Sequence, residues 1–134
     1  MKECLKMEGK SSSEYNPGIS FSLKWGKIRI YRSNLYRMGN PGYIRMLFDP
    51  KKKRFALQAC GKIKGSIRVP ERIGEDWDFR INSIGLLRMI WNIAGWDDKY
   101  SYQIIGQYYA EQKLVEFDLT KAVKIDIVTA TFDV

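Results

Sequence analysis

An internal repeat is the feature that most limits what this chain can fold into. Residues 28–38 align without a gap on residues 79–89. Each segment is followed by a glycine, an alternating apolar run, a polar turn and a second apolar run. A repeated strand–helix–strand–turn–strand unit predicts two like halves, so we expect a pseudo-twofold relation between residues 19–60 and 78–120. A chance match among common residue types is the alternative. The identical pairs are Arg29/Arg80, Ile30/Ile81, Leu35/Leu86, Arg37/Arg88 and Met38/Met89.

In the first half, apolar residues alternate with polar ones, which is typical of strands with one buried face. Glycine and proline separate the alternating runs and mark the turns between them. The expected elements are strands at 19–25 and 28–30, a short helix capped by Ser33 or Asn34 and ended by Gly39, and a hairpin of 44–48 with 55–59 around a turn that starts at Asp49.

In the second half, the stretch 84–94 is apolar nearly all round, which predicts one buried helix. Its expected ends are Ser83 as the N-cap and Gly95 as the stop. Strands are expected on both sides of this helix. They are an edge strand near Ile67 and Val69 within a connection at 61–77, a hairpin of 100–105 with 114–119, and a closing strand at 123–130.

These elements define the expected fold class. We expect a mainly β (α+β) protein, a small antiparallel β domain or barrel with one buried helix. An OB-like or another meandering barrel with one helix is the alternative. Residues 1–18 are rich in Lys, Glu and Ser and predict a flexible N-terminal arm, so residues 19–134 form the expected single domain.

The composition is that of an ordinary globular chain. The 134 residues are 45% hydrophobic and 28% charged, and no apolar run approaches the ~20 residues that span a membrane. Two cysteines, Cys4 and Cys60, make no disulfide framework. We therefore expect a cytoplasmic protein with no membrane partner.

The charge is divided unevenly along the chain. Residues 1–72 contain 17 Lys and Arg and 5 Asp and Glu, whereas residues 73–134 contain 6 and 10. A basic half favours a polyanion such as nucleic acid. The acidic half offers alternatives, because it could contact a protein partner or pair with the basic half, either across a homodimer or within the monomer.

Groups that catalyse reactions or hold metals are scarce. The chain contains no histidine, which removes the commonest general base and metal ligand. The acids Glu75, Asp76 and Asp78, and the pair Asp97 and Asp98, stand where solvated turns are expected. No glycine-rich phosphate-binding motif is present. We expect a protein that is not an enzyme and that uses no cofactor and no metal.

Basic residues gather around the second expected strand and at the tip of the first hairpin. Arginine and lysine on one strand face can follow phosphates, and arginine can also reach base edges. The alternative is an ordinary solvated face, above all at the hairpin tip, which we expect to be flexible. The candidate nucleic-acid-binding residues are Lys24, Lys27, Arg29, Arg32, Arg37, Lys51, Lys52 and Lys53.

The stretch from Gly26 to Leu57 resembles the swapped-hairpin DNA-binding proteins of the AbrB, MazE and MraZ kind. In this family a glycine, a basic residue and a β-branched residue open a strand, and a one-turn helix ending at glycine leads to a hairpin. Here Gly26, Lys27, Ile28, Ile30 and Gly39 follow that order. The family's proline after the strand is replaced by Tyr31, and no arginine stands at Leu35 or Tyr36 inside the helix.

The resemblance implies a DNA-binding regulator of transcription, with Lys27 as the basic position that transfers directly. MraZ-like proteins carry two such units in one chain, which agrees with the internal repeat. Two other functions stay open: a protein-interaction module that acts through the acidic second half, and a binder of single-stranded nucleic acid that uses basic and aromatic residues.

Overall fold

A computed structural model describes residues 17–70 and 79–126. The described residues are mostly β, with one main helix, so the expected fold class is confirmed. Most of the expected arm 1–18, much of the connection before residue 79 and the end of the closing strand lie outside the described residues. The elements are β1 (Gly18–Ser22), β2 (Lys27–Ile30), α3 (Arg32–Arg37), β3 (Tyr43–Asp49), β4 (Arg54–Cys60), β5 (Ile67–Arg68), β6 (Phe79–Asn82), α4 (Ile84–Ala94), β7 (Tyr100–Ile105), β8 (Gln107–Tyr109), β9 (Leu114–Asp118), the 3-10 helix η1 (Leu119–Lys121) and β10 (Val123–Asp126).

Two antiparallel five-stranded sheets enclose the core. The first sheet has the order β10-β7-β1-β2-β6 and the second has the order β5-β3-β4-β9-β8. Phe21 of the first sheet meets Phe55 of the second edge to face, with 5.5 Å between the ring centroids. The Phe117 ring packs beside the Phe55 ring, with 6.3 Å between the ring centroids. All three rings are fully buried, so these aromatic contacts tie the two sheets together.

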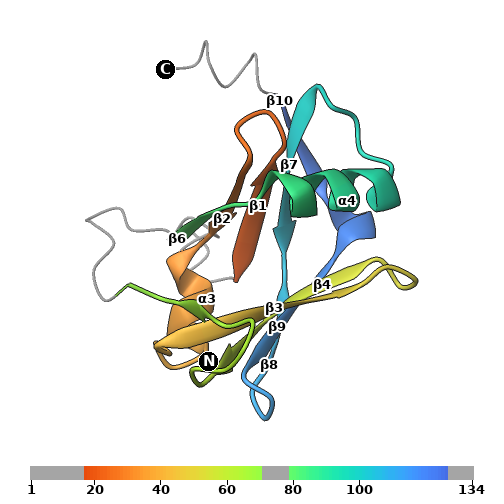
Figure 1. The fold of residues 1–134 in the computed structure, drawn as a ribbon. Coiled ribbons are helices and arrows are strands. Elements are labelled where there is room, and N and C mark those ends of the chain that lie inside the picture. The colour runs from red at the N-terminus through yellow and green to blue at the C-terminus, as the bar shows by residue number, and fades with distance from the viewer. Residues whose placement is uncertain (1–16, 71–78, 127–134) are drawn as a thin grey trace.

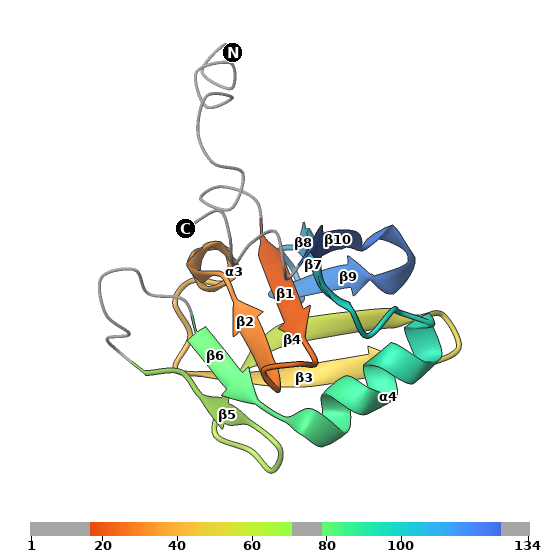
Figure 2. The same cartoon turned by 90° about the horizontal axis from the view of Figure 1, so that it is seen from above.

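The strand order agrees with the expected twofold relation only in part, because β2 lies between β1 and β6 whereas β6 is at the sheet edge, and β3 pairs with β4 whereas β7 does not pair with β9. β2 and β6, which begin the two copies of the repeat, pair antiparallel with Arg29 directly opposite its repeat equivalent Arg80. β1 precedes the first copy and pairs with β7 of the second half, whereas β5 precedes the second copy and pairs with β3 of the first half. Each half therefore contributes a strand that pairs with a strand of the other half. The two α-helices lie on opposite sides of the molecule (Figure 1, Figure 2).

The first strand is shorter than its alternation predicts. β1 ends at Ser22, and the expected continuation to Trp25 is wrong. A tight turn follows because Gly26 adopts a left-handed φ of 67° and donates its N–H to the Leu23 carbonyl at 3.1 Å. The Trp25 side chain consequently leaves the core and is 62% exposed.

The second expected hairpin is also corrected. β9 pairs with β4 and β8 in the second sheet, whereas β7 pairs with β1 and β10 in the first. Gly106 lies between β7 and β8, and the chain changes sheets there. A Cβ on this residue would come within 2.6 Å of the Phe117 ring. The absence of a side chain thus lets the backbone cross close to the core.

The short helix α3 is not capped as expected. Its N-cap is Tyr31, and neither Ser33 nor Asn34 caps it, because both lie inside the helix and are buried. The Asn34 amide Nδ2 instead donates to the Gly18 carbonyl at 2.6 Å and to the Tyr31 carbonyl at 2.8 Å. This side chain therefore fastens α3 to the start of β1.

The main helix α4 is buried on one side only. Leu87, Ile90 and Trp91 face the core, whereas Ile84 and Met89 are 44% and 43% exposed. The prediction of a helix buried all round is wrong, because sheets contact only one side of α4. Its stop is confirmed, since Gly95 has a left-handed φ of 72°. In the described part of the chain, no helix has the length and apolar character of a membrane span.

Candidate functional site

The outer face of the first sheet carries exposed cations on neighbouring strands. Ile28 and Ile30 of β2 point into the core, so Lys27 and Arg29 point away from it and are exposed. Arg80 of β6 is exposed opposite Arg29. We call Lys27, Arg29 and Arg80 the basic wall. Arg29 and Arg80 lie directly opposite one another across β2 and β6, and Lys27 lies diagonal to Arg80.

Charge falls away across the sheet from the basic wall. The register aligns Arg80, Arg29, Ser20, Gln103 and Val123 in one row that crosses β6, β2, β1, β7 and β10. The row begins with two guanidinium groups, continues through a hydroxyl and an amide, and ends with an exposed apolar side chain. One side of this face therefore suits an anion and the other an apolar group.

The neighbouring row also runs from a cation through polar side chains to an apolar side chain, and it lines a hollow. Lys27 of β2 lies opposite Ser22 of β1, and Ser101 of β7 lies opposite Ile125 of β10. Serine side chains are much shorter than those on both sides of them. They form the floor of a hollow of about 280 Å³. The basic wall borders this hollow on one side and Ile125 on the other.

Trp25 stands at the rim of the hollow, and the turn between β1 and β2 holds it there. Its backbone N–H lies 3.4 Å from the Ser22 hydroxyl that accepts its hydrogen bond. The Lys24 ammonium lies 5.1 Å from the centroid of the Trp25 ring, a cation–π contact. An exposed indole and several cations thus surround one hollow.

Tyr31 bounds the same face at the other end of β1 and β2. A Cβ on Gly18 would lie 2.6 Å from the Tyr31 ring, so the ring rests directly on the Gly18 backbone. The Arg29 guanidinium lies 5.5 Å from the centroid of this ring. Tyr31 occupies the position where the resembling family has proline, and here its ring contacts an arginine of the basic wall.

The structure brings together only part of the predicted basic set. Lys27 and Arg29 line the hollow, and Lys24 reaches it through Trp25. Arg32 and Arg37 belong to α3, and neither lines the hollow. The remaining three lysines lie on the turn between β3 and β4, in the other sheet: Lys51, Lys52 and Lys53.

The backbone of the lysine turn is hydrogen-bonded to neighbouring residues. The Asp49 carboxylate accepts the N–H groups of Lys51 and Lys52 at 3.1 and 3.2 Å. The Lys53 carbonyl accepts the N–H of Leu119 at 3.0 Å. These hydrogen bonds join the backbone of the turn to Asp49 and Leu119, and the flexibility expected for its tip stays a prediction. Its three side chains are exposed, as expected for a hairpin tip.

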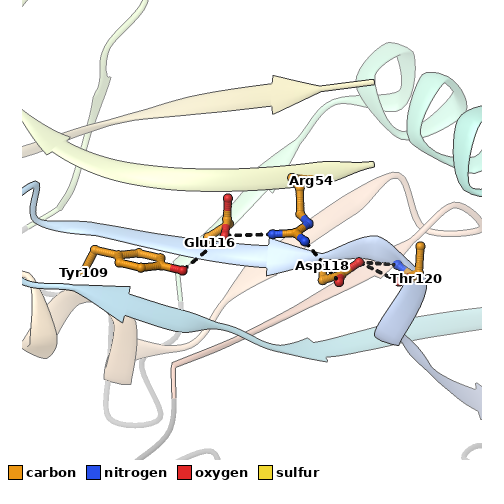
Figure 3. A network of polar contacts seen from close by, with 5 residues as sticks. All are labelled: Arg54, Tyr109, Glu116, Asp118 and Thr120. Atoms are coloured by element: carbon orange, nitrogen blue, oxygen red, sulfur yellow. Dashed lines mark hydrogen bonds and ion pairs between the residues drawn. The ribbon is translucent and has the colours of Figure 1, made fainter. Parts of the chain in front are cut away.

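On the outer face of the second sheet, basic and acidic side chains form ion pairs with one another. Arg54 of β4 lies between two carboxylates of β9, with its Nη1 atom 3.0 Å from Glu116 and its Nη2 atom 3.7 Å from Asp118 (Figure 3). The Thr120 hydroxyl donates to Asp118 at 2.7 Å. This hydrogen bond is the largest cause that lowers the pKa of Asp118, and burial opposes it. These acids are engaged with the protein itself.

Sequence reasoning missed Arg80, Trp25 and the serines of the hollow. A signal for Arg80 was present, because the internal repeat aligns it with Arg29. Trp25 had none, since alternation placed it on a buried strand face. The serines Ser20, Ser22 and Ser101 come from two strands whose pairing only the tertiary structure reveals.

Two further hollows lack this combination of groups. One, near α3, is lined by Leu35, Tyr36 and Val69 among others, and none of the described residues that line it is charged. The other, at the end of α4, includes one cation, Arg88, and one acid, Asp98. Within residues 17–70 and 79–126, no three His, Cys, Asp or Glu side chains gather in a way that could hold a metal ion.

Comparisons with protein-family models, with curated protein sequences and with solved structures found no match for this chain.

Proposed function

We propose that this protein binds nucleic acid, DNA in the first instance, without catalysing a reaction, and that the outer face of the first sheet is the contact surface. The observation that carries the proposal is the basic wall, where Lys27, Arg29 and Arg80 share one exposed face. A phosphate backbone placed along β2 and β6 would contact all three of these exposed side chains.

The surrounding charge supports the same ligand. Between residues 17 and 70 the chain contains thirteen Lys and Arg and a single acid, Asp49. Such an excess attracts polyanions over a range set by the salt concentration. Phosphate contacts of this kind fix orientation and supply affinity, and they carry no sequence information by themselves.

The family resemblance extends the proposal to a regulator of transcription. A strand that starts at Lys27, a short helix, a glycine with a left-handed φ of 85° at Gly39 and a hairpin follow one another as the AbrB-like pattern requires. The pairing of β2 with β6 and the exchange of β1 and β5 also suit two such units joined in one chain.

A protein partner on the acidic half has less support. Of the ten acids in residues 73–134, four lie outside the described residues, and Glu116 and Asp118 contact Arg54. Residues 79–126 by themselves contain six acids and six Lys and Arg, so the acidic excess of the second half comes from Glu75, Asp76, Asp78 and Asp133, which lie outside the described residues. We therefore keep nucleic acid as the ligand class.

The test compares two variants that each remove three positive charges. One carries Lys27→Gln, Arg29→Gln and Arg80→Gln, and the other carries Lys51→Gln, Lys52→Gln and Lys53→Gln. We expect the first to bind a labelled duplex more weakly, because removing each phosphate contact flattens the slope of log affinity against log salt by about 0.9. The second should stay close to the parent protein. Fluorescence anisotropy at several salt concentrations measures both quantities.

Because both variants lose the same number of positive charges, a difference in their affinities reports the position of the charges and not their number. A larger effect at the lysine turn would contradict the assignment of the contact face. If the parent protein binds neither duplex nor single-stranded DNA at low salt, the proposed function is wrong. Thermal unfolding of both variants checks that surface substitutions leave the fold intact, as expected.

A further inference from the structure

We propose that the hollow beside Trp25 holds the base of one unpaired nucleotide, so that the preferred ligand is a single-stranded nucleic acid. This inference rests on the proposed function and adds the class of nucleic acid and the place of the base. The base would lie against the Trp25 indole above the serine floor. Its phosphate would lie toward Lys27.

The size and shape of the hollow favour a small planar group. Its volume of about 280 Å³ is near the lower end of small-molecule sites, which are typically ~300–1,000 Å³. This is room for one nucleotide unit and not for a helix or a loop of a protein partner. The floor hydroxyls of Ser20, Ser22 and Ser101 both donate and accept hydrogen bonds, so they can serve the polar edge of any base.

The exposure of Trp25 points to stacking. The turn geometry needs glycine at position 26, where φ is 67°, and it sets no demand for an aromatic residue at position 25. The indole is 62% exposed, and the turn presents it in a defined place at the rim. Exposed aromatic rings beside cations are the platform on which proteins stack the bases of single strands.

The polarity of the hollow separates base from phosphate. Lys27 and the rest of the basic wall stand on the β2 and β6 side, whereas Trp25 and Ile125 supply apolar surface. A nucleotide has this same division between an anionic phosphate and a flat apolar base. In a duplex, both faces of each base are covered by its neighbours, so only an unpaired base can enter and stack.

The experiment uses the whole protein and three labelled ligands: a single strand, a strand of the same length without bases, and the matching duplex. The parent protein should bind the base-bearing strand about tenfold more tightly than the abasic one. Trp25→Ala should abolish this difference and leave the affinity for the abasic strand unchanged. Trp25→Phe should keep most of the difference, since a phenyl ring still stacks. Ser20→Ile, which fills the floor and changes no charge, should act like Trp25→Ala.

Tyr109→Ala is the matched control, because it removes an exposed aromatic ring from the second sheet, away from the hollow. It should change none of the three affinities. If Trp25→Ala weakens base-bearing and abasic strands equally, or not at all, no base stacks at this site and the inference is wrong. Tight duplex binding would in that case leave the proposed function standing. A parent protein that binds none of the three ligands would remove both proposals.

Discussion

Gly106 and Trp25 show how much a single position decides in this protein. At Gly106 the backbone passes from the first sheet to the second against Val115 and Phe117, and its amide donates to the Pro17 carbonyl at 2.9 Å. At Trp25 the turn after β1 moves an aromatic ring from the expected core to the rim of the hollow. At both positions the backbone conformation, and not the alternation of apolar residues, decides where the chain or the side chain lies.

Gly106→Ala tests the first of these effects. The new Cβ would lie 2.6–2.8 Å from atoms of Phe117 and Val115, so side chains of the core must shift. We expect the free energy of unfolding to fall by about 1–3 kcal/mol, the usual cost of overpacking. Denaturant titration measures it. Gly61→Ala is the control, because a methyl group on Gly61 would have nothing within 4 Å and its effect should be small. Equal stability of the two variants would contradict the close crossing at Gly106.

At the scale of elements, α4 differs most from its repeat equivalent. α3 spans six residues and α4 spans eleven, although the two helices begin within one residue of each other in the aligned repeat. An aromatic cluster lies at the end of the longer helix: Trp91 of α4 meets Trp96 edge to face with 5.0 Å between the ring centroids, and Trp96 stacks on Tyr102 of β7 at 4.3 Å. The second half therefore contributes more aromatic packing than the first.

A pair of substitutions in α4 tests its one-sided burial. Leu87 is fully buried, so Leu87→Ala should lower the free energy of unfolding by about 2–5 kcal/mol. Met89 is 43% exposed two residues later, so Met89→Ala should change it by less than about 0.5 kcal/mol. Both are measured by denaturant titration. Comparable destabilisation at the two positions would mean that the helix is buried on both sides.

At the scale of the whole molecule, the halves are interlocked. β1 completes a sheet with β7, β5 completes a sheet with β3, and β4 pairs with β9 across the boundary between the halves. One core cluster runs through both sheets, from Ile19 to Leu119. Neither half can therefore bury its own apolar faces alone.

This interlocking predicts one cooperative unfolding transition. Far-ultraviolet circular dichroism and tryptophan fluorescence should give coincident denaturation curves, the mark of two-state behaviour. Ile19→Ala removes a fully buried side chain from β1 and should shift both curves by the same amount. Curves that separate, or a shift in only one of them, would show that the halves unfold independently.

Several parts of this structure follow from the sequence alone. Alternation placed Ile28 and Ile30 inside and Lys27 and Arg29 outside, because side chains of a strand alternate between its faces whatever its partner. The repeat aligned Arg29 with Arg80, and the two then proved to be cross-strand partners. These signals are local or internal to the chain, so they need no knowledge of the fold.

Only the tertiary structure decided which strands pair and where the hollow lies. β9 joins β4 instead of β7, because the crossing at Gly106 carries the chain into the other sheet before β9 begins. Ser101 reaches the floor beside Ser22 through the pairing of β7 with β1, which are far apart in sequence. Alternation determines the face of each residue, whereas the partners of a strand depend on how the whole core closes.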